Sequence, residues 1–255
     1  MSLITLISDF GTTDYYVALL KAAIFRYEPT VTIIDISHNI VRHDIMEASF
    51  YLSSTYAHFP DKTIHVAAVN SFYDQKSQLI LIDHNNHYFI GPNNGLFSLI
   101  FPEVSADSVY LLAENITTFN QYDTVGSAIK NLGIHEQPSD FCTKSVDFDR
   151  KISLQPVITS HQIRATIVHI DQFGNVIINL DLKTFEDIRA DRSYTIYYKS
   201  NDPITALASD YSDCMIGDVC AFFNTTGLLE IAVNMGNAHE LLNLNKNETI
   251  QINFG

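Results

Sequence analysis

The first 135 residues alternate β-branched stretches with amphipathic stretches of helical length, and this alternation limits the possible folds more than any other feature. Strands are expected at residues 3–8, 32–36 and 63–69, with helices at 14–28 and 44–58 between them. Strands joined through such helices run parallel, because each helix returns the chain to the same edge of the sheet. The pattern predicts an α/β domain whose mostly parallel sheet carries helices on both faces.

The second half of this domain adds shorter elements. Residues 79–83 and 88–90 read as a hairpin, residues 108–113 as a strand and residues 124–132 as a helix. The N-terminal domain is therefore expected to span residues 1–135.

The rest of the chain has a different character. Residues 136–160 mix charged residues with two prolines and have no periodicity, which indicates a connection. Residues 161–255 contain short alternating strands separated by turn residues and little helix. This pattern predicts a C-terminal antiparallel β-barrel domain.

The charge balance argues against several classes of partner. With 29 acidic and 15 basic residues the net charge is -14, and no basic stripe exists to bind nucleic acid or an anionic membrane. Three cysteines at irregular spacing suit neither a disulfide framework nor a zinc site. Without a signal-like N-terminus or a long apolar run, the expected location is cytoplasmic.

Familiar catalytic motifs are missing. The sequence has no G-x-G-x-x-G, Walker loop, H-E-x-x-H, nucleophile elbow or paired Cys-x-x-Cys. The ten histidines form no pair with metal-ligand spacing, so no metal site is expected.

Two acids follow the first expected strand. Asp9 ends the strand and Asp14 starts the next helix. Ligands of open α/β sheets bind beyond the carboxyl ends of the strands, where a carboxylate can accept two hydrogen bonds from a ribose diol. The alternative is that both acids cap local structure, and spacing alone favours it.

Three turn-like clusters are ambiguous in the same way. Residues 91–95 (Gly-Pro-Asn-Asn-Gly) and 224–227 (Asn-Thr-Thr-Gly) have loop composition. Residues 171–175 form either a hairpin turn or a ligand site with a ring-stacking Phe173 and an amide donor. Spacing alone favours the hairpin turn.

Taken together, these segments resemble one family along nearly the whole chain. The resemblance is carried, in order, by I-T-L-I-S-D-F-G-T-T-D-Y-Y-V (4–17), D-I-S-H-N-I (35–40), G-P-N-N-G-L (91–96), D-Q-F-G-N-V (171–176) and N-T-T-G-L-L-E-I-A-V-N-M-G-N-A (from 224). The chain resembles the S-adenosylmethionine hydroxide adenosyltransferases, relatives of the fluorinase and chlorinase enzymes.

This resemblance implies an N-terminal α/β domain, a C-terminal β-barrel and a homotrimer whose sites lie between subunits. Such enzymes attack C5′ of S-adenosylmethionine with hydroxide or halide and release methionine. No metal takes part, and no cofactor is implied beyond S-adenosylmethionine itself as substrate or ligand.

In the first domain the resemblance makes Asp9 the ribose-binding aspartate and puts Asp14 near the methionine amine. Asn93 stands where the family has the aspartate of P-D-N-G.

In the second domain Asp171 matches an acid near the methionine amine, and Phe173 and Asn175 match residues around the adenine. Thr225 matches a serine at the methionine end, whereas Thr226 replaces the arginine that follows it.

The water-activating set implied by the family is absent. Asn70 replaces its aspartate, Ser77 an arginine and Asn120 a histidine, while Phe72 and Tyr73 add bulk to a loop that is glycine-bearing in the family. Asn cannot take a proton from water near neutral pH, and losing a general base typically lowers a rate by about 10²–10⁴. His43, His65 or Asp74 could compensate, but spacing selects none.

The leading hypothesis is a protein that binds adenosine or S-adenosylmethionine without efficient hydrolysis. One alternative is an active S-adenosylmethionine hydrolase or adenosyltransferase with an altered nucleophile. The other is a non-catalytic oligomeric scaffold.

Overall fold

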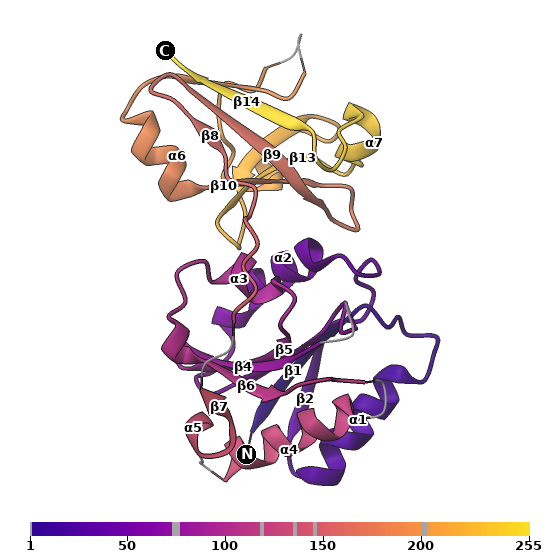
Figure 1. The fold of residues 1–255 in the computed structure, drawn as a ribbon. Helices are drawn as coiled ribbons and strands as arrows, with labels where there is room; N and C mark the ends of the chain where they lie inside the picture. The colour runs from indigo at the N-terminus through magenta and orange to yellow at the C-terminus, as the bar shows by residue number, and fades with distance from the viewer. Residues whose placement is uncertain (1, 73–76, 118–119, 135–136, 145–146, 200–202) are drawn as a thin grey trace. The chain divides into compact units, whose positions relative to one another are not determined.

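The structure is a computed structural model with two compact units, Met1–Ser153 and Leu154–Gly255 (Figure 1). The description covers residues 2–72, 77–117, 120–134, 137–144, 147–199 and 203–255. None of the helices in this described part of the chain combines the length and the apolar composition that a membrane span needs.

The first unit is built around one seven-stranded sheet with the order β2-β1-β3-β5-β4-β6-β7. Strands β2, β1, β3 and β5 run parallel to one another, β4 pairs antiparallel with β5, and β6 and β7 continue the sheet in antiparallel fashion. The elements are β1 (Leu3–Ser8), α1 (Tyr16–Tyr27), β2 (Thr32–Ser37), α2 (Ile45–Thr55), the 3-10 turn η1 (Tyr56–His58), β3 (Ile64–Ala68), β4 (Leu79–His84), β5 (His87–Pro92), α3 (Leu96–Ile100), the 3-10 turn η2 (Ala106–Ser108), β6 (Val109–Ala113), α4 (Gln121–Gly133), α5 (Pro138–Phe141) and β7 (Thr143–Lys144).

Helices cover both faces of this sheet, as the alternation of strands and helices predicts. Leu6 of β1 packs in one core with Leu20 of α1 and with α4. The next residue, Ile7, lies in a second core with Leu52 of α2 and with α3. Successive side chains of a strand point to opposite faces, so one buried strand supplies both cores.

The first unit extends further than the sequence predicts. Residues 138–144, assigned above to a connection over 136–160, form α5 and β7, and β7 pairs with β6. The unit therefore continues to Ser153 and does not end at residue 135. A two-residue strand carries no periodicity that a sequence pattern can detect.

The second unit is a curled antiparallel half-barrel with the strand order β11-β14-β9-β10-β13-β12, and β8 adds to β9 (Figure 1). Its elements are β8 (Val157–Ile158), β9 (Gln162–Ile170), β10 (Val176–Asp181), α6 (Leu182–Arg189), β11 (Tyr194–Tyr197), the 3-10 turn η3 (Tyr211–Asp213), β12 (Val219–Phe223), β13 (Leu228–Val233), α7 (Ala238–Leu242) and β14 (Thr249–Phe254). Its strand content and antiparallel pairing confirm the prediction.

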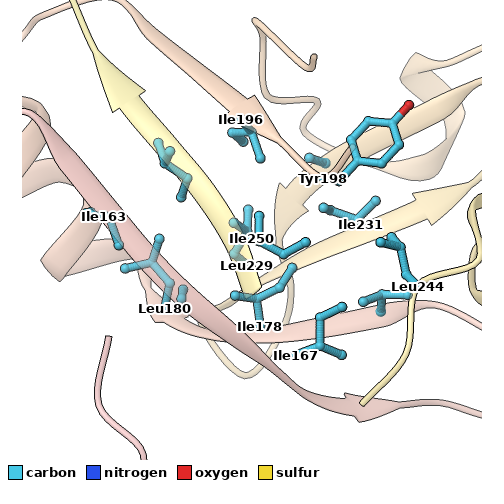
Figure 2. Close-up of a cluster of buried hydrophobic side chains, with 14 of the residues drawn as sticks. Ile163, Ile167, Ile178, Leu180, Ile196, Tyr198, Leu229, Ile231, Leu244 and Ile250 are labelled. Carbon is cyan, nitrogen blue, oxygen red and sulfur yellow. The ribbon is translucent and has the colours of Figure 1, made fainter. Parts of the chain in front are cut away.

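Alternate residues of these strands meet in one apolar core (Figure 2). Ile167 of β9, Ile178 of β10, Ile231 of β13 and Ile250 of β14 are all fully buried there. The expectation of little helix misses α6, whose Phe185 is also fully buried in this core.

A polar pair of histidines lies inside the first unit. His65 of β3 is fully buried. Its Nδ1 lies 2.7 Å from Thr5 Oγ1 and its Nε2 lies 3.1 Å from His87 Nδ1. Burial, with a smaller effect from His87, lowers the pKa of His65 from 6.5 to about 3. Because both ring nitrogens are engaged in the core, His65 is a structural residue and not the compensating base considered above.

We expect the buried His65 to make the folded protein less stable in mild acid. The depressed pKa means that the unfolded ring takes up a proton below pH 6.5 while the folded ring stays neutral until about pH 3. Stability from His65 is thus complete above pH 6.5 and declines as the pH falls, by about 2 kcal/mol at pH 5. Urea denaturation at pH 7 and pH 5 measures this difference. His65→Gln should shrink the pH dependence by that amount, and an equal dependence in both proteins would refute the assignment.

Candidate functional site

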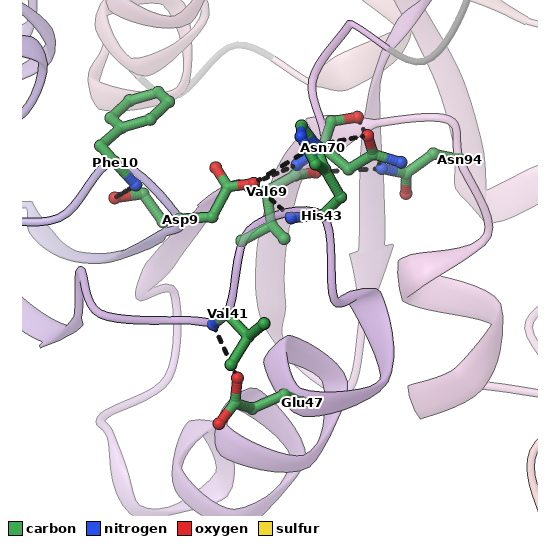
Figure 3. A network of polar contacts seen from close by, with 9 residues as sticks. Asp9, Phe10, Val41, His43, Glu47, Val69, Asn70 and Asn94 are labelled. Atoms are coloured by element: carbon green, nitrogen blue, oxygen red, sulfur yellow. Dashed lines mark hydrogen bonds and ion pairs between the residues drawn. The ribbon is translucent and has the colours of Figure 1, made fainter.

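Asp9 joins the carboxyl ends of three neighbouring strands of the first unit (Figure 3). It directly follows β1, and its Oδ2 accepts the backbone N–H of His43 at 3.0 Å and of Asn70 at 3.1 Å. His43 lies beyond β2 and Asn70 beyond β3, the two strands that flank β1. One carboxylate oxygen therefore holds two loops at the edge where α/β sheets bind ligands.

The second oxygen of Asp9 has no partner among the described residues. Within the described residues Oδ1 accepts no hydrogen bond, and the side chain is only 10% exposed. The local capping interpretation of Asp9 is wrong, because its donors lie 34 and 61 residues away.

His43 and Asn70 meet through their side chains as well. His43 Nδ1 lies 3.1 Å from Asn70 Oδ1, and the same nitrogen lies 3.9 Å from Asp9 Oδ2. Both residues have left-handed backbones, with φ of 65° and 49°, a region that suits Asn better than most residues. The side chain of His43 is 74% exposed. We call Asp9, His43 and Asn70 the strand-end cluster.

Asn94 holds the loop that carries Asn70 in place. Its Nδ2 donates to the carbonyl oxygens of Val69 and Asn70, each at 3.0 Å, and its Oδ1 accepts the N–H of Leu96 at 3.1 Å. Asn94 is buried. From sequence alone, residues 91–95 show only turn-like composition, so this role of Asn94 is not predicted.

Asn93 has a different set of contacts. Its Nδ2 donates to Gln78 Oε1 and to the carbonyl of Asp147, and its Oδ1 accepts the N–H of Asp149, all at 2.9 Å. These bonds engage its amide with the segment that leads out of the first unit. Its ligand contact remains a prediction.

Asp14 is exposed, and it does not cap α1. The N-cap residue is Tyr15, without a side-chain cap bond. The capping interpretation is therefore wrong for Asp14 too, because α1 begins one residue later than such a cap requires.

A buried serine, a buried histidine and an exposed aspartate lie next to the strand-end cluster. Ser8 Oγ lies 2.7 Å from His38 Nδ1. His38 Nε2 is 3.1 Å from Asp35 Oδ1 but makes no well-aligned hydrogen bond to it. The array resembles a hydrolase triad by residue type only, because Ser8 is fully buried and no substrate can reach its hydroxyl. It links the ends of β1 and β2 and so supports Asp9.

In the second unit, residues 171–175 form the hairpin turn between β9 and β10. Asp171 Oδ1 accepts the N–H of Phe173 at 2.9 Å and of Asn175 at 2.8 Å, and its Oδ2 accepts Asn175 Nδ2 at 3.0 Å. Phe173 is 77% exposed, while Asn175 is buried. The hairpin prediction is confirmed, and the turn presents an unpacked aromatic ring beside a fixed amide.

A hydrogen-bonded chain connects this turn with the turn at 224–227. Asn175 Nδ2 donates to Tyr211 Oη at 3.2 Å, Tyr211 Oη donates to Glu230 Oε1 at 2.5 Å, and Asn224 Nδ2 donates to Glu230 Oε2 at 3.0 Å. Burial and the bond to buried Glu230 raise the pKa of Tyr211, which keeps its hydroxyl protonated. Sequence reasoning missed Tyr211 and Glu230.

A pocket of about 460 Å³ lies along this chain. Among its lining residues are Asp171, Tyr211, Phe222, Asn224, Thr225 and Glu230. Of the sequence-predicted residues it brings together Asp171 and the exposed Thr225. No group of three or more His, Cys, Asp or Glu side chains within the described residues is arranged to hold a metal ion.

Comparison with known proteins decides the family. Residues 4–140 match the S-adenosylmethionine hydroxide adenosyltransferase N-terminal domain, and residues 165–251 match the C-terminal domain of that family. The chain belongs to this family.

Relatives in the hydroxide adenosyltransferase family align over almost the full length. A protein named (R)-S-adenosyl-L-methionine hydrolase from Methanocaldococcus jannaschii is 26% identical over 99% of this chain and 96% of its own length. A fluorinase from Nocardia brasiliensis is 21% identical over 99% and 97%. A crystal structure of an uncharacterized conserved protein from Thermotoga maritima has the same fold, with a TM-score of 0.84, 22% identity, and coverage of 98% and 99%.

The three positions that the family resemblance assigns to water activation differ in setting. Asn70 is in the strand-end cluster, Ser77 is buried just before β4, and Asn120 precedes α4 with its Oδ1 accepting the N–H of Thr117 at 2.8 Å. Phe72 is 42% exposed in the structure and fills no buried space. Tyr73 and Asp74 lie outside the described residues.

Proposed function

We propose that this family member binds S-adenosylmethionine, or another ligand with an adenosine moiety, and lacks the efficient hydrolysis expected of a hydrolase. The observation that carries the proposal is the Asp9 carboxylate. It lies at the strand ends with one oxygen held by two backbone N–H groups, and the other oxygen has no partner among the described residues. A ribose diol offers two hydroxyl donors to such a group.

Two residues of the second unit also suit a ligand with an adenine base. Phe173 offers an exposed ring face for a planar base, and ring stacking of this kind needs an aromatic side chain that is not already packed. The buried amide of Asn175 is held by Asp171 and Tyr211, so its orientation is set before any ligand arrives.

The proposed weakness in hydrolysis follows from residue chemistry. Amide and hydroxyl groups at Asn70, Ser77 and Asn120 can orient water but cannot accept its proton near neutral pH. A ligand that is bound but slowly turned over suits a binding or sensing protein.

Isothermal titration calorimetry tests the binding proposal. Adenosine and S-adenosylmethionine should both bind, whereas 2′-deoxyadenosine and 3′-deoxyadenosine should bind more weakly because each lacks one hydroxyl of the diol. The absence of heat from adenosine and S-adenosylmethionine at millimolar concentration would end the proposal.

We also propose the homotrimer that the family resemblance implies. Light scattering should give three times the chain mass of 28.7 kDa. A monomer mass at micromolar concentration would exclude it.

A further inference from the structure

The histidine of the strand-end cluster stands beside the amide that replaces the family's acid. Of the three residues considered as substitutes for the lost base, His65 is engaged in the core and Asp74 lies outside the described residues. His43 alone of these lies against Asn70, at 3.1 Å. The sequence separation of 27 residues gives no hint of this contact.

The contact defines which nitrogen of His43 carries the proton. A carboxamide oxygen only accepts, so His43 Nδ1–H donates to Asn70 Oδ1. The lone pair of the neutral ring is then on Nε2, which bonds to none of the described residues. With 74% of the side chain exposed, Nε2 is open to water. An amide that orients an imidazole base in this way is known from Cys-His-Asn proteases.

The Asp9 carboxylate also lies beside this ring. Its Oδ2 is 3.9 Å from His43 Nδ1. The backbone N–H groups of His43 and Asn70 both bind this oxygen, so the base, its orienting amide and the carboxylate are held as one unit.

We infer that His43 is the general base for slow hydrolysis of bound S-adenosylmethionine, oriented by Asn70. This inference rests on the proposed function. Water attacks C5′ and the C5′–sulfur bond breaks with its electron pair going to sulfur, which leaves neutral methionine thioether and adenosine. The water proton passes to His43 Nε2 and then to solvent. No other reactant is needed.

The first test replaces His43 without straining its backbone. Asn tolerates the φ of 65°, so His43→Asn removes the base and keeps the turn. Formation of adenosine under single-turnover conditions should fall about 100-fold, the lower end of the effect of a general base. The calorimetric Kd of S-adenosylmethionine should change less than about threefold. His58→Asn, at the exposed His58 of η1, is the matched control and should leave both unchanged.

Rescue separates a chemical role from a structural one. His43→Gly is also compatible with the positive φ and leaves room for a free ring. Added imidazole should restore adenosine formation by His43→Gly at least about tenfold and should not accelerate the His58→Asn control.

The orienting role of Asn70 has its own pair of variants. Asn70→Gly suits the φ of 49° but removes the acceptor, and turnover should fall. Asn70→Asp keeps an acceptor for Nδ1–H and should retain at least the parental rate.

The outcomes distinguish this inference from the proposed function. Parental binding with no turnover above a protein-free blank, or with turnover unchanged in His43→Asn, overturns the role of His43 and leaves the binding proposal intact. Loss of binding in the parent protein overturns the proposed function itself.

Discussion

Asp9→Asn is expected to weaken adenosine binding about 100-fold, which corresponds to about 2.8 kcal/mol. The carboxylate accepts two charge-assisted hydrogen bonds from the backbone of His43 and Asn70 and, in the proposed complex, further bonds from the ribose. Hydrogen bonds to charged groups contribute about 1.5–3 kcal/mol each. An amide has only one accepting oxygen, so it cannot serve the loops and the ribose together.

Calorimetry on Asp9→Asn and on a matched control separates the site from general charge effects. Asp107→Asn removes a carboxylate from an exposed position in η2 of the same unit and should bind adenosine like the parent. Near-parental affinity in Asp9→Asn would show that Asp9 does not bind the ribose.

Phe185→Ala is expected to lower the free energy of unfolding of the second unit by about 3–5 kcal/mol. Phe185 is fully buried and its ring packs against Tyr194, Phe223 and Phe254, with centroids 5.2–5.9 Å apart. Removing the ring leaves a cavity that the surrounding strands can fill only in part. Denaturation followed by circular dichroism measures the loss.

Leu182→Ala is the control for that substitution, because Leu182 begins the same helix and is 45% exposed. It should change stability by no more than about 0.5 kcal/mol. Equal losses in both variants would mean that α6 does not cover the core as described.

Helix α6 could not be predicted from the sequence. The strands and long helices of the first unit are readable because their apolar residues repeat with a clear period. In α6 the sequence LKTFEDIR buries a single side chain, so its pattern reads as a polar link between strands. Its one available signal was Asp181, whose side chain caps the helix by accepting the N–H of Thr184.

The candidate site was predictable residue by residue but not as an arrangement. Asp9 and the hairpin of Asp171 stand at strand ends, where sequence reasoning expects polar groups. The meeting of His43 with Asn70 depends on the order β2-β1-β3, which brings together loops that are distant in sequence. The same holds for Tyr211 and Glu230, which are 19 residues apart.

The decisive measurement is the rate at which this protein converts S-adenosylmethionine to adenosine and methionine, measured by chromatography beside the Methanocaldococcus jannaschii relative under identical conditions. With amides at 70 and 120 and a hydroxyl at 77, the rate constant of this chain should be about 10²–10⁴ lower than that of the relative. Equal rate constants would contradict the claim that these substitutions remove efficient water activation.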